Sequence, residues 1–126
     1  MNRLTRNLYV GAYSEAPKDQ AVFCVASEIE GQRVALIDGP GNSAQSVEYA
    51  VRILDEWLQD SAPAIYLCCA AGVSRAPYLA ALWLTWYLDW NFNDALAWIK
   101  TKHPPVSINP AHLEQASEIL ARLRGV

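Results

Sequence analysis

One stretch decides the fold and the chemistry expected of this chain: Cys69-Ala70-Ala71-Gly72-Val73-Ser74-Arg75. It follows the apolar run 65–67 and precedes a long apolar segment with helical spacing. A strand that turns into a helix through small residues leaves backbone N–H groups pointing into the turn, and the helix start adds about half a positive charge. The loop is therefore expected to bind phosphate oxygens. A thiolate at one end can attack phosphorus, and the guanidinium at the other can hold two oxygens in a bidentate fork.

A Cys and an Arg at this spacing also arise by chance, so the motif alone is weak evidence. The residues around it strengthen the expectation. Gly72 lies in the middle of the loop, where a residue without Cβ permits a positive φ and a close approach of the backbone to an anion. Asp38 ends another apolar run and precedes the loop-forming sequence 39–41. The alternatives are a turn-capping role for Asp38 and a buried, inert thiol for Cys69.

The composition is that of one globular domain. The chain has 126 residues, of which 52% are hydrophobic, enough for a single core. A formal charge of −3 without a run of Lys or Arg argues against nucleic-acid binding. No segment has the pattern of a secretory signal or a membrane span, and the three cysteines form neither a disulfide framework nor a zinc-ligand pattern. We therefore expect a cytoplasmic protein that uses no metal or cofactor and binds neither nucleic acid nor membrane.

Short apolar runs alternate with helical patterns along the chain. Runs rich in β-branched or aromatic residues predict strands, which span 8–12, 21–26, 34–37 and 64–68. Apolar residues at three- and four-residue steps predict helices, which run from a Ser43 cap to Asp60, from the Cys69 loop to about Leu88, from an Asn93 cap to the residues before Pro104, and onward from Asn109-Pro110. The inward stripe of the last helix is expected to comprise Leu113, Ala116, Leu120 and Leu123.

Strands separated by helices predict an α/β fold. We expect a single three-layer domain with a mostly parallel central sheet of about four or five strands, flanked by helices. Ligands of such folds bind at the carboxyl ends of the strands, and a phosphate-binding loop between a strand and a helix lies there.

At this level of detail the chain resembles the small dual-specificity branch of the cysteine-dependent protein tyrosine phosphatases, over nearly its whole length. The family's signature loop is similar to 69–75, its first strand to 8–11, its general-acid segment to 35–38, and its closing helices to 94–100 with the residues up to Pro110. Low-molecular-weight phosphatases have the opposite order of loop and acid. Rhodaneses and arsenate reductases would not account for Asp38 together with the C-terminal pattern.

The resemblance implies a mechanism. Cys69 would attack phosphorus to form a cysteinyl phosphate, and Asp38 would protonate the leaving oxygen and then activate water. The phosphate would be bound by Ala70, Ala71, Gly72, Val73, Ser74 and Arg75. The implied substrate is phosphotyrosine, with phosphoserine and phosphothreonine as further candidates, in a protein or peptide. The apolar residues in the loop disfavour phosphoinositides.

Two positions depart from the family pattern. Cys68 stands where the family usually has a histidine that orders the loop, and Ala76 stands where it generally has a hydroxyl that stabilises the departing sulfur. We therefore expect slower capture of substrate and slower hydrolysis of the intermediate. The alternative is a pseudophosphatase, a phosphate-binding module that recognises phosphorylated partners without turnover.

The remaining thiols and aromatic residues are expected to be structural. Cys24 and Cys68 are predicted in the core, with the Cys68 side chain directed away from Cys69, because side chains alternate along a strand. Trapping of an oxidised Cys69 by one of these thiols is the alternative. Large aromatic residues are predicted on buried helical stripes, namely Trp57, Trp83 and Trp98. We expect a monomer. Segment 87–92 is a candidate surface for a partner or for a dimer.

Overall fold

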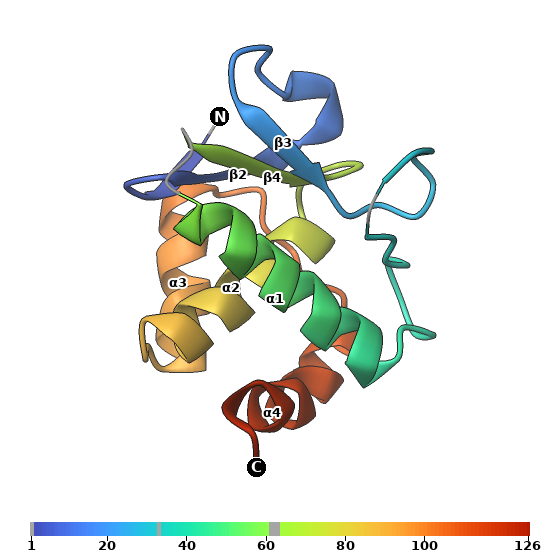
Figure 1. The fold of residues 1–126 in the computed structure, drawn as a ribbon, viewed down its shortest axis with the longest axis vertical. Coiled ribbons are helices and arrows are strands. Elements are labelled where there is room, and N and C mark those ends of the chain that lie inside the picture. Colours follow the sequence, from blue (N-terminus) through green and yellow to red (C-terminus); the bar gives the residue numbers. More distant parts are fainter. Residues whose placement is uncertain (1, 33, 61–63) are drawn as a thin grey trace.

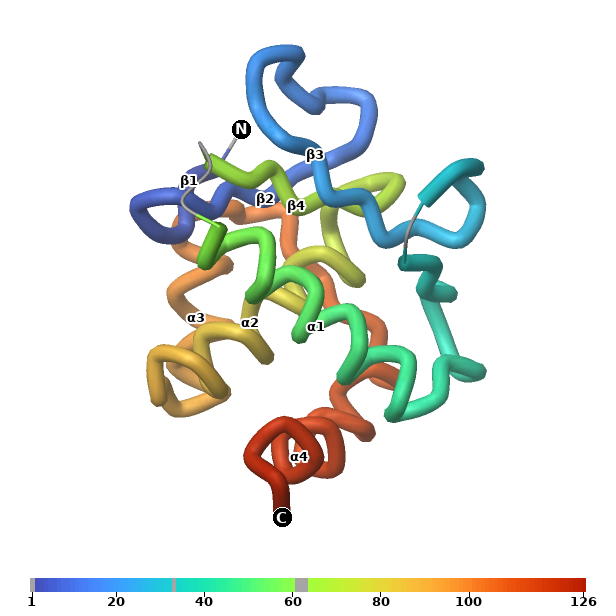
Figure 2. Tube along the Cα trace, in the orientation of Figure 1, coloured from blue at the N-terminus to red at the C-terminus, as the bar shows by residue number. Residues whose placement is uncertain are grey.

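A computed structural model describes residues 2–32, 34–60 and 64–126 (Figures 1 and 2). Its strands are β1 (Asn2–Thr5), β2 (Leu8–Ala12), β3 (Ala21–Cys24) and β4 (Ile65–Cys69). Its α-helices are α1 (Ala44–Gln59), α2 (Arg75–Tyr87), α3 (Phe92–Lys102) and α4 (Pro110–Arg124), and a short 3-10 helix, η1, spans Tyr13–Glu15.

The strands form one sheet in the order β1-β2-β4-β3. Both β2 and β3 run parallel to β4, whereas the edge strand β1 is antiparallel to β2. Every residue of β4 is buried, as expected for a central strand. In Figure 1 the helices lie below the sheet, and the segment between β2 and β3 rises above it. The predicted α/β domain with a mostly parallel sheet is confirmed, and the loops that follow β2, β3 and β4 meet at one edge.

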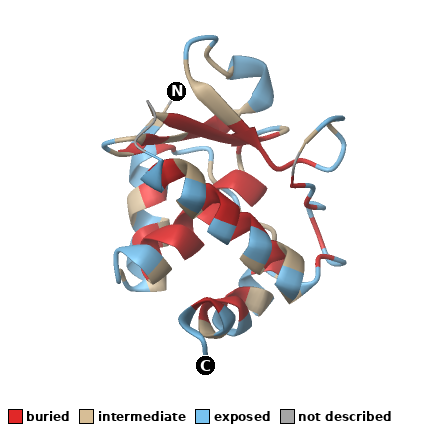
Figure 3. Cartoon of the chain, viewed as in Figure 1, coloured by how far each residue is buried: buried red, intermediate tan, exposed pale blue. Residues whose placement is uncertain are grey.

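Helix α2 occupies the centre of the molecule. Its residues from Arg75 to Thr85 are all buried, and Figure 3 shows them as the buried layer between the sheet and the outer helices. The polar ends of its neighbours are capped as predicted: Ser43 Oγ accepts a hydrogen bond from Ser46 N at the start of α1, and Asn109 Oδ1 accepts one from Ala111 N at the start of α4. Within the described residues, no helix is long and apolar enough to cross a membrane.

The predicted strand at 34–37 is wrong. Only Leu36 pairs with a neighbour, through a single bridge to Ala26. The side chain of Asn42 takes both backbone polar groups of Ile37, accepting from its N–H at 2.9 Å and donating to its carbonyl at 2.7 Å. Because these groups are bonded to a side chain, they are not available to extend a ladder. The strands near 21–26 and 64–68 are confirmed with shifted ends, and β1 was not predicted.

Two further details of the helices differ from expectation. Helix α3 is capped by Asn91 rather than Asn93, since Asn91 Oδ1 accepts from the N–H groups of Asn93 and Asp94. In α4, Leu113 is 41% exposed, and the buried residues are instead His112, Ala116, Ile119, Leu120 and Leu123. Three of the four predicted inward residues are thus buried, and His112, whose ring stacks on Tyr78 of α2, is buried in place of Leu113.

The tryptophans are partly as predicted. Trp83 is buried, whereas Trp57 and Trp98 are half-buried against the core. Trp98 donates its indole N–H to the carbonyl of Leu4 at 3.0 Å, so its polar edge is satisfied. In segment 87–92, Tyr87 is 48% exposed.

Candidate active site

The loop between β4 and α2, which we call the anion loop (residues 69–75), is held by its carbonyl groups. Three of them accept hydrogen bonds from segments outside the loop. The pairs are Tyr13 N to Ala70 O at 3.3 Å, His103 Nε2 with Gly72 O at 2.8 Å, and Ser107 N to Val73 O at 2.8 Å. The N–H groups of residues 71–74 donate to none of the described residues. The loop therefore has its acceptors bonded outward and its donors free for an anion.

Gly72 fixes the shape of this loop. Its φ is +73°, as predicted for a glycine, and a Cβ there would lie 2.3 Å from the carbonyl carbon of Gly11 in β2. The close approach is thus to the protein's own backbone. Because β2 lies directly against the loop, strand pairing in the sheet determines where the loop donors point.

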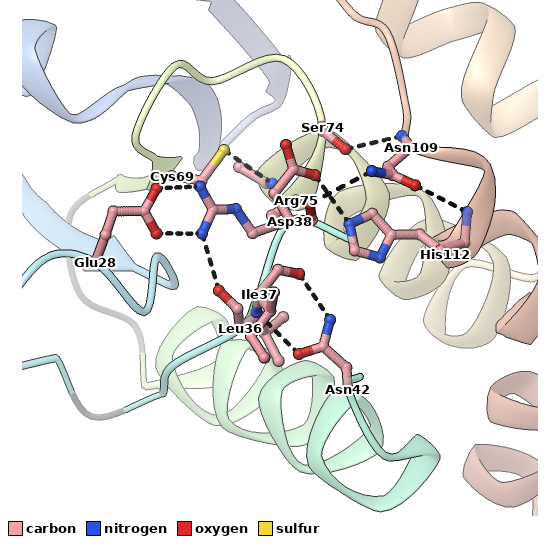
Figure 4. A network of polar contacts seen from close by, with 12 residues as sticks. Glu28, Leu36, Ile37, Asp38, Asn42, Cys69, Ser74, Arg75, Asn109 and His112 are labelled. Atoms are coloured by element: carbon pink, nitrogen blue, oxygen red, sulfur yellow. Dashed lines mark hydrogen bonds and ion pairs between the residues drawn. The ribbon is translucent and has the colours of Figure 1, made fainter. Parts of the chain in front are cut away.

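Arg75, the first residue of α2, is 4% exposed and is held by Glu28. Its Nη1 and Nη2 donate to the two Glu28 carboxylate oxygens, each at 2.6 Å, and Nη1 also donates to Leu36 O at 2.9 Å (Figure 4). The hydrogen bond from Arg75 lowers the pKa of Glu28 to about 2. Among the described residues, the buried Nε has no partner. Glu28 therefore orients the guanidinium and occupies the bidentate fork that the sequence suggested for phosphate, while the Nε–H remains available for a phosphate oxygen.

The sulfur of Cys69 faces the start of α2. Ala76 N donates to Cys69 Sγ at 3.4 Å, so the first turn of the helix supplies a donor to the sulfur. Cys68 and Cys24 are paired in register on β4 and β3, and both are buried. Burial and the adjacent Cys24 thiol raise the pKa of Cys68. Cys24 and Cys68 are core residues as predicted, and Cys68 stays a protonated thiol at neutral pH.

Asp38 lies in what we call the acid loop (residues 37–42), and side chains from distant segments hold it. His112 Nε2 lies 3.2 Å from Asp38 Oδ1, and Asn109 Nδ2 donates to the Asp38 carbonyl at 3.4 Å. The Asp38 side chain is 43% exposed. Figure 4 shows Cys69, Arg75 and Asp38 in one cluster. The hydrogen bond to Glu28 is the main cause that raises the pKa of Arg75, and the charge of Asp38 adds to it. The structure brings the three predicted residues together.

Four side chains at this site were not assigned to it from the sequence. Their shared feature is that they hold the loops from outside: Glu28, His103, Asn109 and His112. The position of Glu28 could have indicated a role at the site, because Glu28 follows a predicted strand whose carboxyl end lies at the same edge of the sheet as the anion loop. No such indication existed for His112, since its direction depends on the rotation of α4. Among the described residues, no three His, Cys, Asp or Glu side chains gather as a metal site.

This fold is that of the dual-specificity phosphatases, as the sequence resemblance predicted. The chain is similar to human DUSP28, with a TM-score of 0.83, 15% identity and coverage of 98% of both chains. It is also similar to the human tyrosine phosphatase-like serine/threonine/tyrosine-interacting protein, with a TM-score of 0.82, 19% identity and coverage of 99% of this chain and 98% of that one. A leucine-rich repeat and phosphatase domain protein of Entamoeba histolytica matches with a TM-score of 0.77, 15% identity and coverage of 98% and 92%. No protein-family model and no curated protein sequence matches the chain.

Proposed function

We propose that this chain is a cysteine-dependent phosphatase that hydrolyses phosphotyrosine, and also phosphoserine or phosphothreonine, in a protein or peptide. The observation that carries the proposal is that the anion loop has bonded carbonyl groups and unbonded N–H groups. Its carbonyls are bonded outward, the N–H groups of 71–74 have no partner among the described residues, and the Arg75 Nε is buried without one. Several donors without an acceptor in one loop at the start of a helix suit a tetrahedral oxyanion. Residues 1–126 then form one catalytic domain.

The first chemical step joins sulfur to phosphorus. The Cys69 thiolate attacks, an S–P bond forms, and the P–O bond to the leaving group breaks. Asp38 gives its proton to the departing oxygen. The loop N–H groups and Arg75 hold the three oxygens that stay on phosphorus, as their charge shifts in the transition state. These steps use no cofactor.

The second step hydrolyses the cysteinyl phosphate. Water attacks phosphorus, the Asp38 carboxylate takes the proton from that water, and the S–P bond breaks to return the thiolate. The side chain of Ala76 has no hydroxyl, so at this position the departing sulfur has only the N–H that lies 3.4 Å away. We therefore expect this step to limit turnover.

The decisive test is hydrolysis of para-nitrophenyl phosphate by the wild-type protein and by Cys69→Ser. Loss of the nucleophile is expected to lower kcat by about a thousandfold or more. Cys24→Ser is the matched control, since Cys24 is an equally buried thiol outside the anion loop. Asp38→Ala should lose most activity on phenyl phosphate, whose poor leaving group needs the proton most. Equal background rates for wild type and Cys69→Ser would reject the proposal.

The slow second step has its own test. Rapid mixing with para-nitrophenyl phosphate should show an initial burst of product, followed by a slower steady rate. Ala76→Ser, which places a hydroxyl near the sulfur, should raise the steady rate and reduce the burst. Ala80→Ser, one turn further along α2 and equally buried, is the control for the polar substitution itself. A progress curve without a burst would contradict slow hydrolysis of the intermediate.

A phosphate-binding module without turnover is the second candidate. Two observations favour it: Ala76 has no hydroxyl, and one of the similar structures is of a protein described as phosphatase-like and interacting. A pseudophosphatase would bind phosphopeptides with the same affinity in the wild-type and Cys69→Ser forms, with no hydrolysis by either. Binding by isothermal titration, measured beside the rates, separates the two candidates.

Substrate class and location follow from the same features. A panel of phosphotyrosine, phosphoserine and phosphothreonine peptides, with a phosphoinositide for comparison, would rank the substrates by kcat/KM. The apolar side chains of Ala70, Ala71 and Val73 favour peptides over the phosphoinositide. The free thiols Cys24, Cys68 and Cys69 suit a reducing compartment, so we propose a cytoplasmic location. We further propose that the protein acts as a monomer.

A further inference from the structure

His112 is a buried residue of α4 whose side chain makes a polar contact with Asp38. Its side chain is 2% exposed, and its Nε2 lies 3.2 Å from Asp38 Oδ1. The imidazole stacks on Tyr78, with ring centroids 5.2 Å apart and planes 17° from parallel. Figure 4 shows the ring directed at the carboxyl group. A ring that is buried and stacked in this way has little freedom to turn, so its Nε2 is fixed relative to the anion loop.

The backbone of Asp38 is held from the same side of the molecule. Asn109, which caps α4, donates its side-chain N–H to the Asp38 carbonyl at 3.4 Å. The backbone N–H of Asn109 in turn donates to Ser74 Oγ in the anion loop at 2.9 Å. The start of α4 therefore connects the acid loop to the anion loop, through the backbone of Asp38 at one point and through its carboxyl group at another.

The contact with His112 makes the two carboxyl oxygens of Asp38 unequal. Oδ1 is bonded to His112, whereas Oδ2 has no hydrogen-bond partner among the described residues. An ionised carboxylate can only accept hydrogen bonds, so in this contact the Nε2 of His112 carries the proton that is donated. Such a donor can stay on Oδ1 whether or not Oδ2 is protonated.

We propose that His112 positions the acid: its Nε2–H holds Asp38 Oδ1, so that Oδ2 is the atom that gives and takes the proton. The proposal rests on the function proposed above. In the first step the O–H bond at Oδ2 breaks, and one forms on the leaving oxygen. In the second step Oδ2 takes a proton from the attacking water. His112 keeps its own proton throughout, and its hydrogen bond to Oδ1 is present both before and after Oδ2 gives up its proton.

The test compares His112→Phe, which keeps the aromatic stack but has no donor, with His112→Gln, which keeps a donor. His112→Phe should lower kcat/KM on phenyl phosphate by about tenfold or more and on para-nitrophenyl phosphate by less than about threefold, because kcat/KM reports the first chemical step, in which only the poor leaving group depends strongly on the acid. His112→Gln should restore most of the lost rate. In an Asp38→Ala background, His112→Phe should have no further effect. Ile119→Val, buried in α4 away from the acid, is the control.

Equal losses on the two substrates, or an undiminished loss in the Asp38→Ala background, would overturn the proposal. If His112→Phe does not fold, His112→Gln alone provides the test. A loss of activity on phenyl phosphate in His112→Gln as large as the loss in Asp38→Ala would overturn the proposal. A second readout needs no activity: proton NMR should show a downfield imidazole N–H in wild type and Cys69→Ser that disappears in Asp38→Ala. A resonance that persists in Asp38→Ala would also overturn the proposal. Equal hydrolysis by wild type and Cys69→Ser would instead reject the proposed function. The NMR result would still show whether His112 donates a hydrogen bond to Asp38.

Discussion

The anion loop and the acid loop face the same site but are held in different ways. The anion loop joins a buried strand to a buried helix, and its own backbone carbonyls are bonded to three surrounding segments. The acid loop has two positive-φ glycines, Gly39 and Gly41, and depends on side chains from elsewhere, with Asn42 clamping Ile37 and His112 contacting Asp38. The proposed binding of phosphate would thus depend on backbone geometry, whereas the proposed proton transfer would depend on a few side-chain contacts.

This difference predicts that the two functions can be lost separately. Changes in the anion loop should remove phosphate binding and hydrolysis together. Changes around the acid loop should spare binding and affect hydrolysis of substrates with poor leaving groups.

The largest effect is expected from Arg75→Lys. Lysine cannot form the fork that the guanidinium makes with Glu28 while keeping another donor for phosphate. By analogy with loss of one oxyanion donor, kcat/KM should fall by about a hundredfold to a thousandfold on every substrate. Vanadate inhibition should weaken in parallel. Arg6→Lys, on the surface, is the control, and tight vanadate binding by Arg75→Lys would break the proposed link between binding and the loop.

Gly72→Ala should produce the next largest effect, on stability. The substitution combines left-handed strain with a Cβ that overlaps the backbone of Gly11, so we expect a loss of about 2–5 kcal/mol in the free energy of unfolding. Gly31→Ala is a matched control, since Gly31 has a similar φ of +81° with nothing within 4 Å of its Cβ position. Urea denaturation should show only about 1–2 kcal/mol for that control. Equal losses in the two variants would mean that the contact with β2 does not constrain the loop.

Asn42→Ala tests the acid loop alone. Loss of the two hydrogen bonds to Ile37 should cost about 1–2 kcal/mol of stability and let Asp38 move away from the leaving group. Activity on phenyl phosphate should fall by about tenfold, within the range of a general acid's contribution, with vanadate inhibition unchanged. Asn93→Ala, at an exposed position of α3, should behave as wild type. Weaker vanadate inhibition in Asn42→Ala would show that the two loops are not separable.

The smallest effect is expected from Glu28→Gln, and it should depend on pH. Because the pKa of Glu28 is lowered from 4.5 to about 2, its carboxylate adds stability above pH 4.5 that is lost as the pH falls toward 2. Wild type should therefore have a higher melting temperature than Glu28→Gln, but the difference should be small, since the Glu28 side chain is 52% exposed. This difference should shrink as the pH falls from 4.5 toward 2. Glu30→Gln is the control. A margin that does not change with pH would exclude the ion pair as its cause.

Much of the site could be predicted because its parts lie close together in sequence. Cys69, Gly72 and Arg75 share one loop, so their types and spacing indicate an anion site before any tertiary contact is known. The predicted strand at 34–37 failed because the side chain of Asn42, a residue that periodicity treats as loop, bonds the backbone of Ile37. The inward stripe of α4 is confirmed at Ala116, Leu120 and Leu123 and wrong at Leu113, where His112 is buried instead and stacks on Tyr78.

The sequence by itself determined the α/β fold, the anion loop and the candidate nucleophile, since apolar periodicity and a strand-loop-helix motif are local properties of the chain. Only the tertiary structure decided that Glu28 orients Arg75 and that His112 and Asn109 hold Asp38. Those contacts join segments far apart in sequence, and their geometry depends on strand order and on the rotation of α4, which packing of the whole domain sets.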